Sequence, residues 1–331
     1  MTSMMKAVVI TRPGGPEVLE IQERPLPEPG GEEVRVRVLV AGLNRGDLAQ
    51  RVGHYPAPPG APADIPGLEF MGVVDALGPR VHGWQTGQRV FGLVAGGGYA
   101  EYVLTHERLL AEVPSNLSDI EAGAVPEVFM TAHDALFRQA RLVMGERVLI
   151  HAAGSGMGTA AIQLAHAAGA TSYGTSRSPE KLQRVRELGL DVALPAPDFL
   201  AALREATAGA GVNVVLDFVG APYMAQNLEA LAPRGRLIQV GLMGGGKAEV
   251  DLRLLMNKRL QLMGTVLRSR PLDEKALVTH RFVDHVVPLL SRGVVRPVVD
   301  TVFSLAEVAA AHRYLESNAS FGKVLLQVGE R

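Results

Sequence analysis

The sequence predicts an α/β protein that combines a β-rich domain with a doubly wound parallel sheet. Two observations lead to this fold class. Up to about residue 125 the chain consists mostly of short strand-like runs, and glycine and proline separate nearly all of them. From about residue 126 to 267 strand-like and helix-like segments alternate, and a tail of two helices and a last strand follows.

The β-rich part is predicted from its short apolar runs, of which EVRVRVLVAG alternates most clearly between apolar and polar residues. The other runs are KAVVIT, VLEIQ, GVVDALG, RVFGLV and YAEYVLT. The gaps contain stretches such as RPGGPE, PLPEPGGEE and YPAPPGAPADIPG. We therefore expect long irregular loops between these strands.

The alternating part predicts a parallel sheet whose ligands lie at the carboxyl ends of the strands. The strand candidates are Val148–His151, Thr171–Thr175, Val192–Leu194, Val212–Phe218, Leu237–Gly241 and Leu260–Leu267. The helix candidates lie at about 157–168, 179–188, 198–208, 222–232 and 251–257. In the tail, Ser304 and Glu307 have the spacing of a capping box before a helix at 305–316, and FGKVLLQV is the last strand.

Composition excludes several classes of function. With 331 residues, 47% hydrophobic and 20% charged, the chain can form globular cores, and a net charge of -1 offers no basic field for nucleic acid. No apolar run is long enough to span a bilayer, and the start enters a strand-like run without the features of a signal peptide, so we expect a cytoplasmic protein. The absence of cysteine excludes disulfides, thiolate nucleophiles and cysteine-bound zinc.

A glycine-rich stretch predicts a nucleotide site. In VLIHAAGSGMGTAAIQLAHAAGA, residues 148–170, Ala153, Gly156 and Gly158 follow a predicted strand and open a predicted helix. Glycine also marks tight turns and close helix packing, but a strand that leads into a helix N-terminus within a βα unit favours a pyrophosphate.

The end of the second strand of this sheet indicates which nucleotide is bound. Folds that prefer NAD place an acid there to hold the ribose 2′-hydroxyl, whereas this chain has Ser176, Arg177 and, one turn further, Lys181. Hydroxyls and cations suit a 2′-phosphate, so the sequence favours NADPH over NADH. An alternative is that Ser178 and Pro179 simply start a helix, and both interpretations can hold together.

With these motifs the sequence resembles the zinc-independent quinone oxidoreductase branch (zeta-crystallin-like) of the medium-chain dehydrogenase/reductase superfamily, and within it most closely the p53-inducible type. The motifs that carry the resemblance are Asn44-Arg45-Gly46-Asp47 continuing through Arg51, Gly53, Tyr55 and Pro56, then GLEFMG, EVFMTAHDAL, the glycine motif, GLMGGG and LRSR. The resemblance covers essentially the whole chain. It implies a GroES-like catalytic domain formed by residues 1–126 and 268–331, and a Rossmann NADPH-binding domain formed by residues 127–267.

One departure from the wider superfamily concerns metal. Zinc-dependent relatives carry Gly-His-Glu, with the histidine on the catalytic zinc, and the corresponding stretch here is Gly67-Leu68-Glu69. Leucine cannot bind a metal, and the chain has no cysteine for the other ligands, so we expect no zinc. The scattered histidines, among them His54, His133 and His151, are expected to be loop or packing residues.

The resemblance also implies roles for individual residues. Asn44, Tyr55 and Thr131 are expected to border the nicotinamide and the acceptor, with Ser155 pointing toward the nicotinamide end. Tyr55 would line the acceptor site as a polarising hydroxyl or a stacking face, although it could be a packing residue. One interpretation gives Asp47 a supporting role in the site. The other is that its carboxylate caps the short helix or pairs with Arg51 four residues later.

Further cofactor contacts are expected at the ends of the later strands. Val219 and Gly220 end the fourth strand, and Gly241, Leu242 and Met243 end the fifth, although GLMGGG could also be a flexible loop. Within the glycine motif the expected contacts are Ala153, Ser155, Gly156, Met157 and Gly158. Many relatives carry a tyrosine after the third strand that helps to hold the 2′-phosphate, and this chain reads ALPAPD there.

The function that these observations predict is NADPH-dependent reduction of a quinone, held in the cleft between the domains, by hydride or electron transfer without zinc. An NADPH-dependent enal or enone double-bond reductase is the first alternative. A crystallin-like or RNA-binding role, known in this branch, is the non-enzymatic one, and the near-neutral charge argues against nucleic acid.

The sequence also predicts assembly. Leu260–Leu267 is apolar and stands sixth in the sheet, where the usual strand order puts it at an edge that is prone to association. The resemblance implies that two subunits join these edges as a homodimer about a two-fold axis. A monomer with a covered edge is the alternative.

Overall fold

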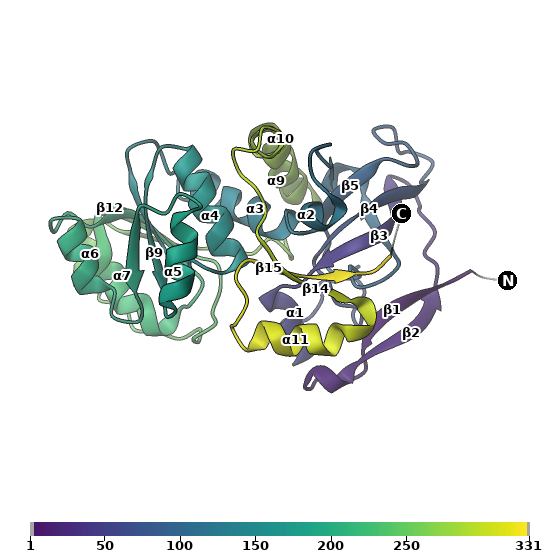
Figure 1. Ribbon diagram of the computed structural model, residues 1–331, viewed down its shortest axis with the longest axis horizontal. Coiled ribbons are helices and arrows are strands. Elements are labelled where there is room, and N and C mark those ends of the chain that lie inside the picture. Colours follow the sequence, from purple (N-terminus) through teal and green to yellow (C-terminus); the bar gives the residue numbers. More distant parts are fainter. Residues whose placement is uncertain (1–2, 330–331) are drawn as a thin grey trace. The chain divides into compact units, whose positions relative to one another are not determined.

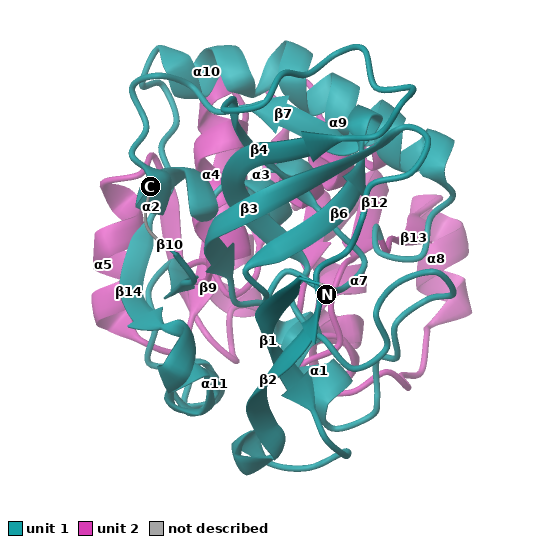
Figure 2. Ribbon diagram, turned by 90° about the vertical axis from the view of Figure 1, so that its right-hand side faces the viewer, with its two compact units in different colours: residues 1–130, 267–331 teal, residues 131–266 magenta. Residues whose placement is uncertain are grey.

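The computed structural model describes residues 3–329, which form two compact units. The first contains the chain up to residue 130 and from residue 267 onward, and the second contains residues 131–266, as the colours of Figure 2 show. The chain therefore leaves the first unit, forms the second, and returns to complete the first.

The first unit is built on a seven-stranded sheet with the order β14-β15-β3-β4-β5-β7, in which β6 also pairs with β3, and on a two-stranded sheet of β1 and β2 (Figure 1). The strands are β1 Met4–Ile10, β2 Leu19–Pro25, β3 Glu33–Gly42, β4 Glu69–Leu77, β5 Arg89–Leu93, β6 Tyr102–His106, β7 Leu110–Glu112, β14 Val299–Ser304 and β15 Lys323–Gln327. The helices are α1 Arg45–Arg51, α2 Asp119–Gly123, α9 Leu272–His285, α10 Val287–Ser291 and α11 Val308–Glu316.

The central strand β3 explains how this sheet is stabilised. The first half of β3 alternates between half-buried and buried residues, with Val34, Val36 and Val38 facing the core. These valines pack with Phe70 of β4 and with the apolar face of α11. Two segments that are far apart in the sequence thus share one hydrophobic core.

The second unit is a parallel sheet with the order β10-β9-β8-β11-β12-β13, which is the doubly wound order that the sequence predicts. Its strands are β8 Arg147–Ile150, β9 Thr171–Ser176, β10 Val192–Pro195, β11 Val212–Asp217, β12 Leu231–Gln239 and β13 Gln261–Gly264. Its helices are α4 Gly156–Ala167, α5 Pro179–Arg186, α6 Leu200–Ala206, α7 Met224–Ala230 and α8 Leu252–Lys258. Helix α3, Pro126–His133, crosses the boundary between the units, and a π-helical turn at Asp134–Gln139 continues it.

Two strands of the second unit differ from the predicted bounds by more than one residue at an end. β12 begins at Leu231 rather than Leu237, because Leu231 already pairs with Val212 before a bulge that contains Pro233 and Gly235. β13 is shorter than predicted and spans only Gln261–Gly264. The prediction that it lies at an edge of the sheet is confirmed.

Local signals at helix ends are confirmed more closely. The amide N–H and hydroxyl of Ser304 both donate to the Glu307 carboxylate, at 2.9 and 2.7 Å, in the capping box that the spacing predicts. A short 3-10 turn at Leu305–Glu307 then leads into α11. Throughout residues 3–329, none of the helices combines the length and the apolar character that crossing a membrane requires.

Candidate active site

The glycine-rich segment of the second unit forms a tight turn between β8 and α4. Ser155 caps the helix, because its hydroxyl oxygen accepts a hydrogen bond from the Gly158 N–H at 3.0 Å. A Cβ atom on Gly158 would lie 2.5 Å from the carbonyl oxygens of Ala152 and Ala153, so only glycine fits there. The Ser155 cap and the close contact of Gly158 with Ala152 and Ala153 thus fix the turn between β8 and α4.

This turn leaves backbone donors available. Among the described residues, the N–H groups of Gly154, Gly156 and Met157 have no hydrogen-bond partner. They stand at the N-terminus of α4, where the peptide dipoles of the helix also favour negative charge. The predicted residues Ala153, Ser155, Gly156, Met157 and Gly158 therefore lie together in one turn, where free N–H groups meet the start of a helix.

A buried polar chain lies behind this turn. The ring of His151 contacts the Thr175 hydroxyl through Nδ1 at 2.9 Å and the Asn227 Oδ1 through Nε2 at 2.7 Å. Asn227 in turn donates to Asp217 at 3.0 Å, so its oxygen must accept and His151 must donate from Nε2. Burial lowers the pKa of His151, which keeps the ring neutral. The interpretation of His151 as a packing residue is confirmed.

The end of β9 carries the residues predicted to select the nucleotide. Ser178 caps α5 by accepting from the Lys181 N–H at 3.2 Å, with Pro179 at the first helical position, as the helix-start alternative predicts. Arg177 is exposed. A Cβ atom on Gly154 would approach the Lys181 side chain to 3.0 Å, which places the stem of Lys181 against the glycine turn. The helix-start interpretation is thus confirmed at Ser178 and Pro179, and the 2′-phosphate interpretation of Ser176, Arg177 and Lys181 stays a prediction.

The ends of β11 and β12 are joined by backbone hydrogen bonds. The Gly244 N–H donates to the Val219 carbonyl at 2.7 Å, and the Met243 N–H donates to the Phe218 carbonyl at 3.2 Å. Val219 and Gly220 both donate to the Asp217 carboxylate. These hydrogen bonds hold Met243 and Gly244 against the end of β11, and the GLMGGG segment lies outside the helices and strands, as a loop does. Gly241, Leu242 and Met243 follow β12, with the side chains of Leu242 and Met243 exposed.

In the first unit, Asp47 is a buried carboxylate that joins three segments. It accepts hydrogen bonds from the Asn44 N–H at 2.8 Å, from the Tyr99 hydroxyl at 3.0 Å and from the Gly67 N–H at 3.1 Å. Burial raises the pKa of Asp47 to about 6 despite these donors. Of the two local alternatives, the capping role is confirmed and the pairing with Arg51 is wrong, because Arg51 pairs with Glu316 instead.

Asn44 is held by a buried ion pair that the sequence did not predict. The Lys323 ammonium donates to the Glu69 carboxylate at 2.5 Å, the Asn44 Oδ1 at 2.8 Å and the Leu43 carbonyl at 2.8 Å. The Asn44 Nδ2 donates to Glu69 at 2.8 Å and to the Gly42 carbonyl at 3.3 Å. A lysine inside the apolar run FGKVLLQV is the signal that could have revealed this contact.

Tyr55 lies in the proline-rich loop between α1 and β4, next to α1. A Cβ atom on Gly46 would come within 3.2 Å of the Tyr55 ring, so the ring lies directly on the first turn of the helix that follows Asn44. Burial raises the pKa of Tyr55 to about 12. Among residues 3–329 the Tyr55 hydroxyl has no hydrogen-bond partner. It is a protonated donor at neutral pH.

The predicted site residues therefore fall into two groups. The first unit brings together Asn44, Asp47 and Tyr55 around α1. The second unit brings the glycine turn together with the ends of β9, β11 and β12. Thr131 is buried on α3 and belongs to the second unit by its contacts, and its place beside Asn44 and Tyr55 stays a prediction.

Comparisons with known proteins agree with this architecture. Residues 30–115 match the family model of an alcohol dehydrogenase GroES-like domain, and residues 156–283 match that of a zinc-binding dehydrogenase. The quinone oxidoreductase of Pseudomonas aeruginosa is 34% identical over 330 residues, which cover 98% of this chain and 99% of that protein. The chain belongs to the quinone oxidoreductase family of medium-chain dehydrogenases/reductases.

Solved structures place this quinone oxidoreductase family member among nicotinamide enzymes. A mycobacterial protein complexed with NADPH has a TM-score of 0.89 and 28% identity, with 98% of this chain and all (100%) of that chain covered. An NAD-dependent alcohol dehydrogenase has a TM-score of 0.88 and 35% identity, with 98% and 100% covered. The protein is therefore an oxidoreductase that uses a nicotinamide cofactor.

Another relative is much longer. A phenolphthiocerol/phthiocerol polyketide synthase of Mycobacterium tuberculosis is 32% identical over 321 residues, which are 96% of this chain and 14% of that protein. The chain thus spans about one seventh of this relative, in contrast to the full length of the quinone oxidoreductases.

The donor set does not fit the zinc that the name of one family model implies. Leu68 replaces the histidine of the zinc-dependent members of the superfamily, and its neighbour Glu69 is already bound to Lys323. The sequence has no cysteine to complete a site. Within residues 3–329 no three histidine, aspartate or glutamate side chains gather as metal ligands do.

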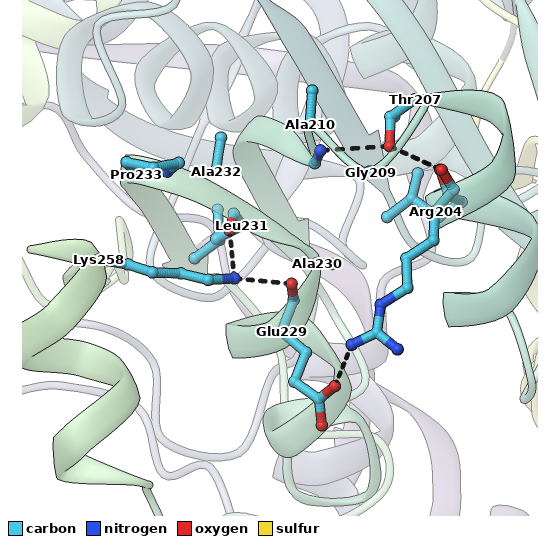
Figure 3. Close-up of a pocket in the computed structure, with 12 residues that line it drawn as sticks. Arg204, Thr207, Gly209, Ala210, Glu229, Ala230, Leu231, Ala232, Pro233 and Lys258 are labelled. Carbon is cyan, nitrogen blue, oxygen red and sulfur yellow. Dashed lines mark hydrogen bonds and ion pairs between the residues drawn. The ribbon is translucent and has the colours of Figure 1, made fainter.

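A small pocket of the second unit lies away from the candidate site. It has a volume of ≈ 90 Å³ and lies where β11 and β12 begin, whereas the glycine turn lies where β8 ends. Figure 3 shows the Lys258 ammonium directed at backbone carbonyls at the end of α7, to which it donates at 2.7–3.3 Å. Lys258 therefore caps the C-terminal end of α7.

Proposed function

We propose that the enzyme transfers hydride or electrons from NADPH to a quinone without zinc. The observation that carries the cofactor choice is the end of β9, where Ser176, Arg177 and Lys181 offer a hydroxyl and two cations. No carboxylate stands between Thr175 and Pro179 to hold a ribose 2′-hydroxyl. A 2′-phosphate would gain charge-assisted hydrogen bonds at this place.

The glycine turn supports binding of the pyrophosphate. Its free N–H groups at Gly154, Gly156 and Met157 would face the phosphate oxygens, and Ala153 and Gly158 allow the close approach of the backbone. We propose further cofactor contacts from Thr131, Val219 and Gly220, and from Gly241, Leu242 and Met243 after β12. The cofactor, when bound, supplies the hydride.

The acceptor needs a partner for the oxygen that gains charge. A quinone or enone accepts hydride without a strong electrophile, and a hydrogen bond to its oxygen stabilises the product anion. Tyr55 is the proposed donor, because its hydroxyl is protonated at neutral pH and has no partner among the described residues. Asn44 and Ser155 are proposed to orient the nicotinamide, and Asp47 holds Asn44 in place through its N–H.

The test is direct. NADPH is titrated into the protein while its fluorescence is followed, and a small para-quinone is then added. Oxidation of NADPH at a rate well above that of NADH supports the proposal. Binding without oxidation by any quinone or enone would contradict it and would favour a crystallin-like role, whereas retention of RNA by the protein would favour the RNA-binding role.

The second candidate is an NADPH-dependent enal or enone reductase. A solved enoyl reductase has a TM-score of 0.86 and 28% identity, with 98% of this chain and 99% of that chain covered, which favours this chemistry. The two reactions differ in the product, a hydroquinone or a saturated carbonyl compound. A semiquinone signal during turnover would identify one-electron transfer to quinones.

We also propose a cytoplasmic homodimer. β13 is the edge of its sheet, and Leu262 on it is 37% exposed. The preceding helix α8 exposes Leu252 and Met256, four residues apart, by 65% and 72%. An apolar strand edge beside an apolar helix face would be covered by the same elements of a second copy about a two-fold axis.

A further inference from the structure

Arg268 is a buried cation that connects three loops of the first unit. It lies in the LRSR stretch, just after the chain returns from the second unit, and only 6% of it is exposed. Its Nε donates to the Ala95 carbonyl at 2.8 Å, its Nη1 to the Tyr55 carbonyl at 2.8 Å and its Nη2 to the Gln50 Oε1 at 2.6 Å. All three guanidinium nitrogens are used, so this side chain has one fixed orientation.

The same guanidinium lies over the Tyr55 ring. The distance from Arg268 Cζ to the ring centroid is 4.7 Å, which is within the range of a cation–π contact. The ring also lies on Gly46, where a Cβ atom would come within 3.2 Å. Tyr55 is thus fixed by its own carbonyl, by the guanidinium above its ring and by the backbone of α1, although its loop has no regular secondary structure.

The loop itself depends on this contact. Gln50, which accepts from Arg268, donates from Nε2 to the Ala63 carbonyl at 3.3 Å near the far end of the loop. The Gly97 N–H donates to the Ile65 carbonyl at 2.9 Å, just after Ala95. Arg268 therefore joins the segment that carries Tyr55 to Gln50 and to the turn that contains Ala95. Without its guanidinium, Gln50, Tyr55 and Ala95 would each lose a hydrogen bond.

The charge of Arg268 is not neutralised by an ion pair. Among the described residues no carboxylate lies within ion-pair distance of it, and its partners are two carbonyls, an amide and a ring. Asp47 and Glu127 act on it only at longer range, and Lys275 of α9 is near enough for Arg268 to help lower the pKa of that lysine. Arg268 is the cation that lies over the Tyr55 ring, and Glu127 and Asp47 act on the same tyrosine with negative charge.

We propose that Arg268 is the positioning residue of the acceptor site: it fixes the Tyr55 hydroxyl against the acceptor oxygen, so that this hydroxyl stabilises the oxyanion that forms there. This rests on the proposed function. Hydride, with its electron pair, forms a bond to the conjugated acceptor and the nicotinamide is oxidised, while the acceptor carbonyl becomes a phenolate or enolate oxygen. Tyr55 donates a hydrogen bond to that oxygen, and solvent later supplies the proton.

The acceptor class follows from this arrangement. A planar conjugated carbonyl compound places its new charge on one oxygen, beside the phenol and the guanidinium. Acceptors without a carbonyl, such as dyes that take up charge on nitrogen, would gain little from Arg268. Because the donor set fits no zinc, the Tyr55 hydroxyl that Arg268 holds would supply the electrostatic assistance for reduction.

The experiment combines Arg268→Met with Tyr55→Phe in a double-mutant cycle. NADPH and a small para-quinone are the substrates, and an enone is used if the quinone is not turned over. We expect Arg268→Met to lower kcat by about 30-fold, with the NADPH Kd changed by less than about twofold. In the Tyr55→Phe background the same change should lower kcat by less than about threefold, because the hydroxyl through which Arg268 acts is gone.

Two further variants complete the design. Arg35→Met is the matched control, because Arg35 is also a largely buried arginine over a tyrosine ring, 5.8 Å from the centroid of Tyr102. It should leave kcat within about twofold. Arg268→Lys retains the charge and loses the three-point contact, so we expect it to lower kcat by about fivefold. This decrease should also be absent in the Tyr55→Phe background. If Arg268→Met does not fold, the Arg268→Lys variant provides the test.

Each outcome has a distinct meaning. A loss that is equal in both Tyr55 backgrounds, or one confined to the NADPH Kd, would overturn the role of Arg268, because a structural defect does not depend on the Tyr55 hydroxyl. An equal loss in Arg35→Met would do so as well. A wild-type enzyme that reduces neither quinones nor enones would instead end the proposed function. The inference is supported if the wild type is active and the Tyr55→Phe background removes most of the effect of Arg268→Met on kcat.

Discussion

Lys323 and Glu69 form an ion pair that is almost completely buried and joins the last strand of the first unit to β4, 254 residues earlier in the chain. Lys323 also holds Asn44. The contact therefore connects the stability of the first unit with the geometry of a proposed cofactor residue. It is a long-range counterpart of the local network around Asp47.

Removal of one partner of this pair should be costly. We expect Lys323→Met to lower the free energy of unfolding by about 3–5 kcal/mol, because Glu69 would be left as an unpaired buried charge. Adding Glu69→Gln should restore part of this loss. Urea unfolding of the single and double variants measures these changes in the free energy of unfolding. Arg108→Ala is the control: because the ion pair of Arg108 with Asp273 is exposed, this variant should change stability by less than about 1 kcal/mol. A double variant as unstable as the sum of the single ones would contradict the coupling.

Cofactor choice can be tested at Lys181. Each charge-assisted hydrogen bond to a 2′-phosphate contributes roughly 1.5–3 kcal/mol, so Lys181→Ala should weaken NADPH binding by about tenfold or more and leave NADH nearly unchanged. Calorimetric titration with both nucleotides provides the measurement. Arg186→Ala, at the far end of α5, serves as the control. Equal weakening of both cofactors would indicate that Lys181 supports the fold instead.

The pH dependence of stability should reflect His312. Burial, and secondarily the Arg51 charge that bonds its Nδ1, lower the pKa of His312 to about 3. The folded state thus keeps the ring neutral, and its contribution is complete above pH 6.5 and is lost as pH falls from about 6.5 toward 3. Wild type should lose up to about 1.4 kcal/mol per pH unit relative to His312→Gln between pH 6 and 4.

The comparison with His312→Gln is needed because Asp47 acts in the opposite direction. The pKa of Asp47 is raised to about 6, so its protonation favours the folded state as pH falls. Both proteins contain Asp47, and its effect cancels in the difference. Parallel urea midpoints for the two proteins across this range would show that His312 does not titrate as expected.

Assembly is tested by light scattering. We expect a dimer at micromolar concentration, and Met263→Pro should dissociate it, because proline removes a backbone donor from the middle of β13. Circular dichroism of the variant should retain the secondary structure. A wild-type monomer under these conditions would end the proposal that β13 pairs with its symmetry mate.

Metal independence has a simple test. Dialysis of the protein against a strong chelator should leave NADPH oxidation unchanged, because Leu68 offers no ligand and Glu69 is bound to Lys323. Elemental analysis of the purified protein completes the measurement. One zinc per chain, lost together with activity, would contradict the interpretation of Gly67-Leu68-Glu69.

The sequence predicted those features that depend on neighbouring residues. The strand order of the second unit follows from alternating segments, and the caps at Ser178 and Ser304 follow from local spacing. The start of β12 was missed because Pro233 and Gly235 interrupt the apolar pattern. Partners such as Glu69 for Lys323, or Tyr55 for Arg268, could not be predicted, because nothing local specifies contacts across hundreds of residues.

The order of the strands in the first unit has a consequence for synthesis of the chain. β15 lies between β14 and β3, and its residues Leu325–Gln327 pair with residues 40–42 at the end of β3, which β4 joins from the other side. A ribosome delivers the chain from the N-terminus, so the residues of the second unit are all synthesised while this edge of β3 still lacks its partner β15. The sheet of the first unit can close only when β15 has emerged, and a product that stops before it would expose an unpaired, apolar strand edge to chaperones and proteases.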